Sequence, residues 1–403
     1  MRNQVLEEKI LKIDKSKWNP TKLGTLAEDI SVRVDKPGNS EYDRFVGLDN
    51  FISGDIKIKS WASTENLTSS AKAFKTGDIL FARRNAYLRR ASLVDFDGCC
   101  SGDAFVIREN LDKVTPGFLA FLMNTNSLWD YANSNAAGTM SKRVKWRDLA
   151  EYEFLLPPKA EQARLAELLW AMDEVIEKEK DVLERLNNYF LSKLNSLFWD
   201  QRVATQKTKF GSIPIHWQLF RLEEVSRKIG DGIHSTPNYV ANSNFRFING
   251  NNIIDSKIQF TDRTQFVSEQ EFSKYNLKLE KGTILMSING TIGNLGFYNG
   301  EDVVLGKSVA FITPANDKLF NDYLYFLLQT KKIQDFYNRE LTGTTISNLS
   351  LKSIRNTPVP LAPYDEQFLI ANSARQLVEL LTKSKNKLAS SQSLQKSLIN
   401  QIF

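Results

Sequence analysis

The amino-acid sequence predicts an α+β protein built from two similar globular α/β domains separated by two long antiparallel coiled-coil helices, with a pseudo-two-fold internal repeat. Three observations support this prediction. The chain has 403 residues, which exceeds one ordinary compact domain. The second half repeats motifs of the first half, and each half ends in a long run of apolar residues spaced three and four apart.

The repeat is visible as pairs of similar segments at nearly constant spacing. Trp18 in KWNPTKLGTLAEDI corresponds to Trp217 in HWQLFRLEEVSRKI, an offset of 217 − 18 = 199. Farther along, FLAFLMNTNSLWDY from Phe118 corresponds to YLYFLLQTKKIQDF from Tyr323, an offset of 323 − 118 = 205. This second offset pairs Gly138-Thr139 with Gly343-Thr344, Leu149 with Ile354, Leu156 with Leu361, Pro158 with Pro363, and Glu161-Gln162 with Glu366-Gln367.

The change of offset indicates that the second copy gained about six residues in its first half. Insertions accumulate in surface loops, so the two copies should share a scaffold and differ in their loops. Different loops on one scaffold suggest two related but unequal ligands. Within each copy, short strands are predicted in GDILFARR, GTILMSIN, AFVIRE and VAFITP, with helical segments near Phe118 and Tyr323.

Each copy then begins a long helix at a proline, in LLPPKAEQ and VPLAPYDEQ. The apolar seam of the first helix consists of Leu165, Leu169, Met172, Ile176, Glu179, Leu183, Leu186, Phe190, Leu194 and Leu197, with Glu179 as the one polar interruption. The second seam keeps the register but is more polar: Ile370, Ala374, Leu377, Leu381, Ser384, Leu388, Ser391, Gln395, Ile399 and Ile402. We expect the two helices to pack against each other, each about 60 Å long; the alternative is that each packs on its own domain only.

These signals predict four segments along the chain. The first domain, with a short N-terminal helix, covers 1–157, and the central helix covers 158–200. The second domain covers 201–362, and the C-terminal helix covers 363–403.

Composition limits the class of protein. Charged residues make up 25% and hydrophobic residues 42% of the chain, as in folded proteins without a membrane span. The N-terminal MRNQVLEEKILKIDK has charges where a signal peptide would be apolar, so we expect a cytoplasmic protein that binds no membrane. The net charge of 53 − 47 = +6 and the pI near 9.0 indicate a mild preference for polyanions. Cys99 and Cys100 are adjacent and are expected to be small buried residues.

The sequence contains few residues of the kinds that catalysis or metal binding requires. The only histidines are His216 and His234, and no carboxylate cluster suggests a catalytic or metal site. His234, in the turn-rich GDGIHSTPN, is a candidate base or phosphate contact, or simply a loop residue. Gly306-Lys307-Ser308 resembles part of a phosphate loop, but Glu301 stands where that loop needs glycine. We therefore expect no catalytic residue, no metal and no cofactor on this chain.

Residues suited to DNA binding gather in two basic segments of the first copy and in several polar segments of the second copy. FARRNAYLRR and SKRVKWRD combine arginines and lysines with Tyr87 and Trp146, and such clusters can contact phosphates or guanine edges. The second copy is less basic at the matching places, but amides can read adenine edges. The candidate DNA-binding residues are Arg83, Arg84, Tyr87, Arg89, Arg90, Lys142, Arg143, Lys145, His234, Asn289, Lys307, Asn348 and Lys352. The alternative is that the basic segments are solvated loops.

Taken together, IPIHWQLFRLEEV, the glycines before Leu149 and Ile354, and the paired LPPKAEQ and LAPYDEQ resemble the specificity subunit of a Type I restriction-modification system. The resemblance spans essentially the whole chain. It implies two target recognition domains that read a bipartite, asymmetric sequence in double-stranded DNA, and no catalytic activity on this chain.

The resemblance also implies partners. Two methyltransferase subunits would bring S-adenosylmethionine and methylate adenines, and restriction subunits would use ATP and Mg²⁺. The two helices would then set the distance between the half-sites. The competing hypothesis is a DNA-independent coiled-coil adaptor whose globular domains bind proteins.

Overall fold

The computed structural model describes residues 13–139, 141–199, 204–343 and 347–403. The chain divides into two compact units, residues 1–182 with 385–403 (unit 1) and residues 183–384 (unit 2). Each unit therefore contains one globular domain and one part of each long helix. The predicted N-terminal helix and Thr344 lie outside the described residues.

The described residues of the globular part of unit 1 form three sheets. A two-stranded sheet pairs β1 (Asn19–Lys22) with β11 (Glu153–Leu156). A four-stranded antiparallel sheet has the order β2 (Ala27–Asp29), β10 (Ala104–Glu109), β7 (Ile79–Ala82), β8 (Ala91–Leu93). A five-stranded sheet has the order β3 (Val32–Val34), β6 (Ala71–Phe74), β9 (Gly98–Cys100), β4 (Arg44–Val46), β5 (Ala62–Ser63). The helices of this part are α1 (Phe118–Leu122), α2 (Asn126–Ser134) and α3 (Trp146–Leu149).

The globular part of unit 2 repeats the first two of these sheets and differs in the third. Its two-stranded sheet pairs β14 (Gln218–Arg221) with β25 (Pro358–Leu361). Its first four-stranded sheet has the order β15 (Ser226–Asp231), β24 (Val309–Pro314), β21 (Ile284–Ser287), β22 (Leu295–Phe297). Its second has the order β16 (Tyr239–Val240), β20 (Gln265–Val267), β17 (Phe245–Ile248), β23 (Val303–Leu305). Small hairpins are β12 (Thr205–Thr208) with β13 (Gly211–Pro214), and β18 (Ile253–Ile254) with β19 (Lys257–Ile258). The helices are α5 (Glu269–Tyr275), α6 (Asn321–Leu328), α7 (Lys331–Glu340) and α8 (Leu351–Arg355).

The predicted repeat is confirmed in the two-stranded sheets and in the first four-stranded sheets, whereas the remaining large sheets, of five strands in unit 1 and four in unit 2, share the parallel pairs β4-β9 and β17-β23 but differ in strand number. The orders β2-β10-β7-β8 and β15-β24-β21-β22 are the same plan, and AFVIRE and VAFITP form β10 and β24 over their full lengths. In each unit, apolar residues of these sheets and of the following helices form the main core, around Phe81, Phe118 and Trp129 in unit 1 and around Tyr323 and Leu327 in unit 2.

The extra residues of the second copy are divided between two places. β4 and β9 pair in parallel with Val46 opposite Cys100, and β17 and β23 pair in parallel with Ile248 opposite Leu305. The offset is 305 − 100 = 205 in one strand of the pair but 248 − 46 = 202 in the other. About half of the insertion therefore precedes β17, and the rest lies in the stretch that contains α5.

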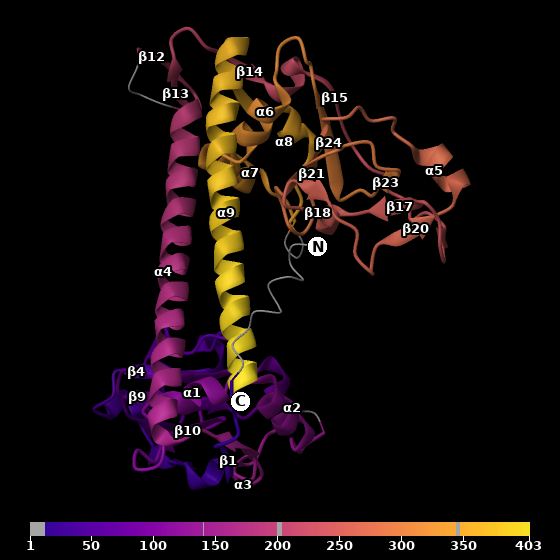
Figure 1. Ribbon diagram of the computed structural model, residues 1–403. Coiled ribbons are helices and arrows are strands. Elements are labelled where there is room, and N and C mark those ends of the chain that lie inside the picture. Colours follow the sequence, from indigo (N-terminus) through magenta and orange to yellow (C-terminus); the bar gives the residue numbers. More distant parts are fainter. Residues whose placement is uncertain (1–12, 140, 200–203, 344–346) are drawn as a thin grey trace. The chain divides into compact units, whose positions relative to one another are not determined.

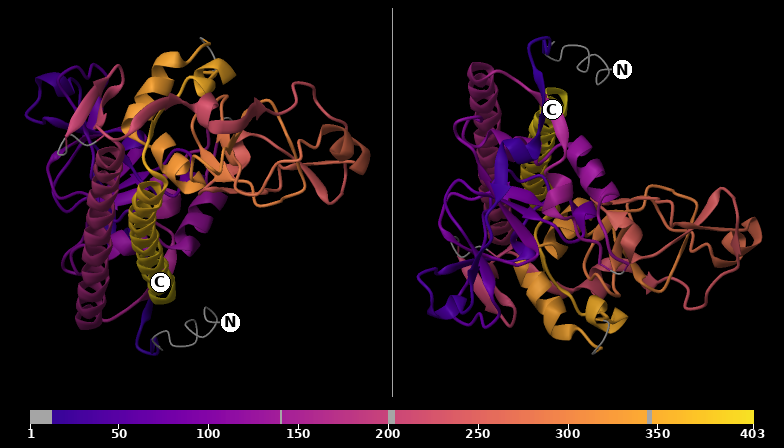
Figure 2. Two further views of the ribbon diagram at one scale, coloured as in Figure 1. Left: turned by 90° about the horizontal axis from the view of Figure 1, so that it is seen from above. Right: turned by 90° about the horizontal axis from the view of Figure 1, so that it is seen from below.

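The long helices are α4 (Lys159–Phe198) and α9 (Tyr364–Ile402), close to the predicted 158–200 and 363–403. In unit 1, Leu169 of α4 shares a core with Ile399 and Ile402 of α9. In unit 2, Leu194 of α4 shares a core with Ala374 of α9. The helices lie side by side and antiparallel within each unit (Figures 1 and 2). Every predicted seam residue is buried or half-buried, so the alternative in which each helix packs only on its own domain is wrong.

In the part of the chain that the structure describes, no helix combines the length and the apolar composition needed to span a membrane.

Candidate nucleic-acid interface

The two basic segments of unit 1 meet directly after the strand β7. Arg84 pairs with Arg143 in an isolated antiparallel bridge, although 143 − 84 = 59 residues separate them. The backbone N–H of Asn85 donates to the carbonyl of Lys142 at 3.1 Å, and the N–H of Val144 donates to the carbonyl of Arg83 at 2.9 Å. FARRNAYLRR and SKRVKWRD, which the sequence presented as separate candidates, thus form one site in the structure.

Asp103 lies at the centre of this site. Its Oδ1 accepts a hydrogen bond from Nε of Arg143 at 2.8 Å, and its Oδ2 lies 3.5 Å from Nη1 of Arg84. Nε of Arg83 is 3.9 Å from Oδ1 of the same carboxylate. The hydrogen bond from Arg143, with the charges of the three arginines, lowers the pKa of Asp103 although burial raises it. Asp103 therefore holds three of the predicted arginines in place, a role that no motif in the sequence indicated.

Arg84, Arg89 and Arg90 also donate side-chain hydrogen bonds to other groups of the protein. Nε of Arg84 donates to Oγ of Ser141 at 2.7 Å. Arg89 turns onto α2, where it donates to Asn126 at 2.7 Å and to Asp130 at 3.0 Å. Arg90 donates to the carbonyl of Leu48 at 2.9 Å. Part of the positive charge seen in the sequence therefore orders the loops.

The exposed part of the site is smaller than the sequence suggested. Tyr87 is 68% exposed in the short 3₁₀ turn Ala86–Leu88. Lys142 and Lys145 are exposed, and among the described residues neither has an ion-pair partner. These three side chains are the exposed candidates of the site in unit 1.

Unit 2 builds the same site at an offset of 205. Asn289 pairs with Asn348 in an isolated antiparallel bridge, as Arg84 does with Arg143. The N–H of Gly290 donates to the carbonyl of Ser347 at 3.1 Å, and that of Leu349 to the carbonyl of Ile288 at 2.9 Å. Asn85 and Gly290 both have a positive φ, of 56° and 75°, which explains why Asn and Gly occupy this position. The backbone of the site is therefore duplicated, and its side chains differ.

The differences remove charge from unit 2. Ile288 replaces Arg83, and Ser308 replaces Asp103, since the backbone N–H of Ile288 donates to the carbonyl of Ser308 as Arg83 does to Asp103. Oγ of Ser308 accepts from the N–H of Gly250 at 3.0 Å and so ties down the neighbouring loop. Asn289 and Asn348 are half-buried at the bridge.

The remaining candidates of unit 2 are Lys307, His234 and Lys352, and all three are exposed. Lys307 is exposed in the turn next to Ser308. Ile233 forms an isolated β-bridge with Gly306, so the exposed His234 lies beside that turn. Nε2 of His234 is 3.0 Å from the carboxylate of Asp231. Lys352 is exposed on α8, four residues after Asn348.

A duplicated joint fixes each domain to its long helix. The indole N–H of Trp18 donates to Glu161 at 3.0 Å, and that of Trp217 donates to Glu366 at 3.0 Å. Oε1 of Gln162 accepts from the N–H of Thr115 at 2.9 Å, and Oε1 of Gln367 accepts from that of Phe320 at 2.8 Å. Each glutamine also donates to the carbonyls of Pro157 and Ala362, respectively, at 2.9 Å. The Glu-Gln pair found in both copies thus positions the domain on the helix.

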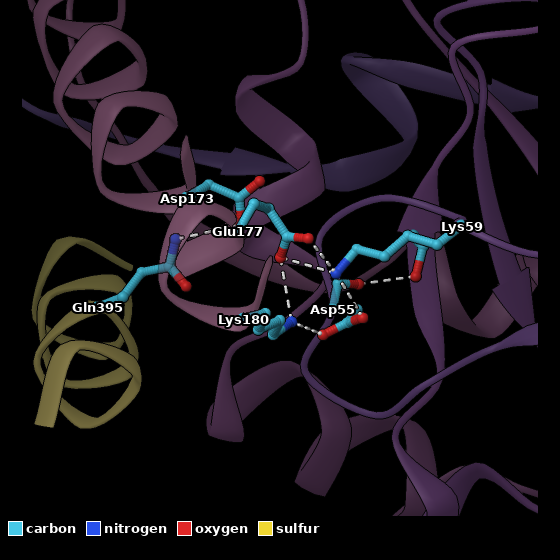
Figure 3. Close-up of polar contacts among 7 residues, drawn as sticks. Asp55, Lys59, Asp173, Glu177, Lys180 and Gln395 are labelled. Atoms are coloured by element: carbon cyan, nitrogen blue, oxygen red, sulfur yellow. Dashed lines mark hydrogen bonds and ion pairs between the residues drawn. The ribbon is translucent and has the colours of Figure 1, made fainter. Parts of the chain in front are cut away.

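Unit 1 has a second, polar connection between its domain and α4 (Figure 3). Nζ of Lys180 on α4 lies 2.7 Å from Asp55 and 3.0 Å from Glu177, and Nζ of Lys59 lies 2.8 Å from Asp55 and 2.7 Å from Glu177. Burial acts to lower the pKa of Lys180, but its hydrogen bonds to Asp55 and Glu177 outweigh this effect and raise it. In unit 2, Arg375 of α9 pairs instead with Asp322 of α6.

In the described ranges, no group of three or more His, Cys, Asp or Glu side chains is placed to bind a metal ion. Cys99 and Cys100 are both buried, as predicted, and neither forms a disulfide. Burial raises the pKa of Cys99 to about 11 and that of Cys100 to about 12, so both stay protonated thiols at neutral pH.

Comparison with known proteins agrees with this architecture. Residues 15–188 and 214–390 each match the family model of the Type I restriction modification DNA specificity domain. The EcoDI specificity subunit of Escherichia coli is 33% identical over 144 residues, which cover 35% of the chain and 32% of that relative. The MjaVIII specificity subunit of Methanocaldococcus jannaschii is 23% identical over 73% of the chain and 75% of that relative.

Solved structures resemble the fold over nearly its full length. One chain, described under "Structural basis underlying complex assembly and conformational transition of the type I R-M system", has a TM-score of 0.61 at 23% identity, covering 97% of this chain and 98% of that one. The Type I restriction-modification S subunit of M. genitalium has a TM-score of 0.54 at 18% identity, covering 98% of both chains.

Proposed function

Because the chain belongs to the Type I restriction-modification DNA specificity family and carries that domain twice, we propose that each unit reads one half of a bipartite, asymmetric DNA target. The chain is a DNA-recognition subunit, and the catalysis belongs to its partners. The observation that carries the proposal is the duplicated bridge, Arg84 with Arg143 in unit 1 and Asn289 with Asn348 in unit 2.

The two bridges suit different readings of DNA. Arginine and lysine contact phosphates and the O6 and N7 atoms of guanine. Asparagine offers a donor and an acceptor that match the N7 and N6 atoms of adenine. With Arg84, Lys142 and Lys145 on one backbone and Asn289, Asn348 and Lys307 on its copy, the two half-sites should differ in sequence.

The partners follow from the function. We propose that two methyltransferase subunits dock on the long helices, bring S-adenosylmethionine and methylate adenines in each half-site. Restriction subunits that use ATP and Mg²⁺ would complete the complex, which would act on cellular DNA in the cytoplasm. Exposed apolar residues of α4 at seven-residue steps support a helical docking face: Leu168, Val175, Val182 and Tyr189.

The helices offer a way to set the distance between half-sites. Each is about 60 Å long at 1.5 Å per residue, longer than the roughly 34–36 Å between half-sites one DNA turn apart. Inserting a few residues in register into both α4 and α9 should lengthen the unread spacer and leave both half-sites unchanged. A changed half-site in the resulting methylation pattern would refute this role of the helices.

DNA binding is tested by the affinity of the purified chain, with its methyltransferase partner, for a random duplex at increasing salt. Phosphate contacts release counterions, so we expect the affinity to fall steeply as salt rises. Lys142→Ala/Lys145→Ala should flatten this dependence, and Lys331→Ala, an exposed lysine of α7 that is already paired with Asp335, is the control. Absence of DNA binding, or binding insensitive to salt, would favour the coiled-coil adaptor.

A further inference from the structure

Arg44 on β4 lies against two aromatic side chains of unit 1. Its guanidinium carbon is 4.6 Å from the ring centre of Trp61 and 4.9 Å from that of Phe96. The two rings contact each other, with centres 4.8 Å apart. Trp61 is 43% exposed and the Arg44 side chain is 36% exposed, so the group is held in place by the rings but reaches solvent.

Arg246 on β17 has the same surroundings in unit 2. Its guanidinium carbon is 4.7 Å from the ring centre of Phe260 and 4.5 Å from that of Phe266. Phe260 is 44% exposed and Arg246 is half-buried. In each unit one ring precedes the strand that pairs with the strand of the arginine: Trp61 precedes β5 and Phe260 precedes β20. The second ring differs, being Phe96 in unit 1 and Phe266 of β20 in unit 2.

The two arginines occupy the same position of the repeated sheet. Val46 is opposite Cys100 and Ile248 is opposite Leu305, and these are equivalent pairs in the two units. Arg44 and Arg246 each precede that pair by two residues in their strand. The two domains differ in sequence at many other positions. Both nevertheless have an arginine at this position, and in both it lies against two aromatic rings.

The side-chain donors of these arginines have no hydrogen-bond acceptor in the ranges that the structure describes. Among the described residues, neither Arg44 nor Arg246 donates a side-chain hydrogen bond, whereas Arg84, Arg89, Arg90 and Arg143 all do. The nearest carboxylate to Arg44 is that of Asp43, 3.9 Å away and 86% exposed. Such a loose surface pair contributes little. Within the described part of the chain, each unit thus presents an oriented guanidinium whose N–H groups have no hydrogen-bond partner.

We propose that Arg44 and Arg246 are an equivalent pair of DNA phosphate contacts, one in each recognition domain. This inference rests on the proposed function and adds residues outside the bridged sites. A guanidinium held on aromatic rings loses little side-chain freedom when it binds, and its planar set of donors matches phosphate oxygens. A contact shared by two domains with unequal targets has to be made to the DNA backbone, because the backbone is the part that unequal targets share.

The test substitutes Arg44→Gln and Arg246→Gln, singly and together, in the chain assembled with its methyltransferase partner. Affinity for the target duplex and for a random duplex is measured across a series of salt concentrations. Each substitution should weaken both affinities by the same factor, roughly 3- to 10-fold, and reduce the slope of log affinity against log salt by about 0.9. Arg33→Gln and Arg221→Gln, exposed arginines whose charge is already paired with Asp35 and with Glu223 and Glu224, are the controls.

The conservative variants Arg44→Lys and Arg246→Lys separate a DNA contact from a structural role. They keep the charge but lose the planar stacking, so they should retain the salt slope with a smaller loss of affinity. If the Gln variants lower the melting temperature, the Lys variants still provide the salt slope of a folded chain.

Three outcomes would overturn the inference while leaving the proposed function intact. They are an unchanged affinity, a loss confined to the target duplex, and a loss with an unchanged salt slope, each in variants of a wild-type chain that binds DNA. If the wild-type chain does not bind DNA, the proposed function itself fails. The two failures are therefore distinguishable.

Discussion

Unit 1 and unit 2 share a backbone site but not its electrostatics. In unit 1, Asp103 holds three arginines around the bridge between Arg84 and Arg143. In unit 2, Ser308 stands in place of Asp103, and the bridge joins two asparagines. The backbone hydrogen bonds that close the site have nearly the same lengths in both units.

This difference shows which parts of the site are fixed and which can vary. Because the loops are held together by backbone groups, the side chains at the bridge can change without loss of the scaffold. Charge can then be added in one unit, with a carboxylate to balance it, and left out in the other. Recognition of two unequal half-sites needs this combination of a constant frame and variable side chains.

The sharpest check of the common frame is the buried glutamine of each joint. Gln162 and Gln367 are both 1% exposed and make matching hydrogen bonds. Gln162→Ala and Gln367→Ala should each lower the free energy of unfolding by about 1–3 kcal/mol, because a half-buried backbone N–H loses its acceptor and a carbonyl loses its donor. Denaturant unfolding followed separately in the two units measures this. Clearly unequal losses would mean that the two joints are not equivalent.

The contrast in charge predicts different salt behaviour. Lys142→Ala/Lys145→Ala should weaken DNA binding about 10-fold and lower the salt slope by about 1.8, since two phosphate contacts are removed. Asn289→Ala/Asn348→Ala should weaken binding to the target about as much but leave the slope unchanged, because no charge is lost. Binding titrations at four salt concentrations distinguish these results. A changed slope in the asparagine variant would contradict the assignment of base contacts to unit 2.

The carboxylate at the centre of unit 1 has no charged counterpart in unit 2. Asp103→Asn should destabilise unit 1 by about 1–2 kcal/mol, since three arginines lose their common partner. Ser308→Ala, the matched change in unit 2, should cost less than about 1 kcal/mol, as one neutral hydrogen bond is lost. Thermal unfolding of both variants tests the difference, which should vanish if Asp103 were merely a surface residue.

The contribution of Asp103 to the stability of unit 1 should depend on pH. The pKa of Asp103 in the folded state lies below its usual value of 3.8, mainly because Arg143 donates a hydrogen bond to it. The unfolded chain takes up this proton at a higher pH, so the stabilisation is complete above the usual pKa and is lost as pH falls through the folded pKa. The difference in stability between wild type and Asp103→Asn should therefore shrink on acidification below about pH 4. An unchanged difference at pH 3 would show that the pair is not responsible.

The sequence predicted the scaffold better than the site. Trp18, Trp217 and the Glu-Gln pairs appear in both copies because they make the same hydrogen bonds, and the seam residues repeat because both helices bury them. Asp103 could not be predicted, since it aligns with Ser308 and belongs to no motif. FARRNAYLRR indicated positive charge, but composition does not show that Arg89 and Arg90 donate hydrogen bonds to neighbouring segments of the protein.

Arg44 and Arg246 were missed for a different physical reason. They correspond at an offset of 202, whereas the visible motifs correspond at 199 or 205. Strand pairing, rather than sequence spacing, aligns them, and their aromatic partners do not correspond residue by residue, because Phe266 stands opposite Arg246 where Ser63 stands opposite Arg44. An alignment guided by β-sheet register would have found them.

The most direct test is to map methylated adenines in DNA from cells that carry the chain with its methyltransferase partner. The wild type, Arg84→Gln and Asn289→Ala are compared. If each unit reads its own half-site, Arg84→Gln should relax one half of the bipartite target and Asn289→Ala the other, with the spacer unchanged. Relaxation of the same half by both variants, or of both halves by either variant, would contradict recognition by two independent copies of one site.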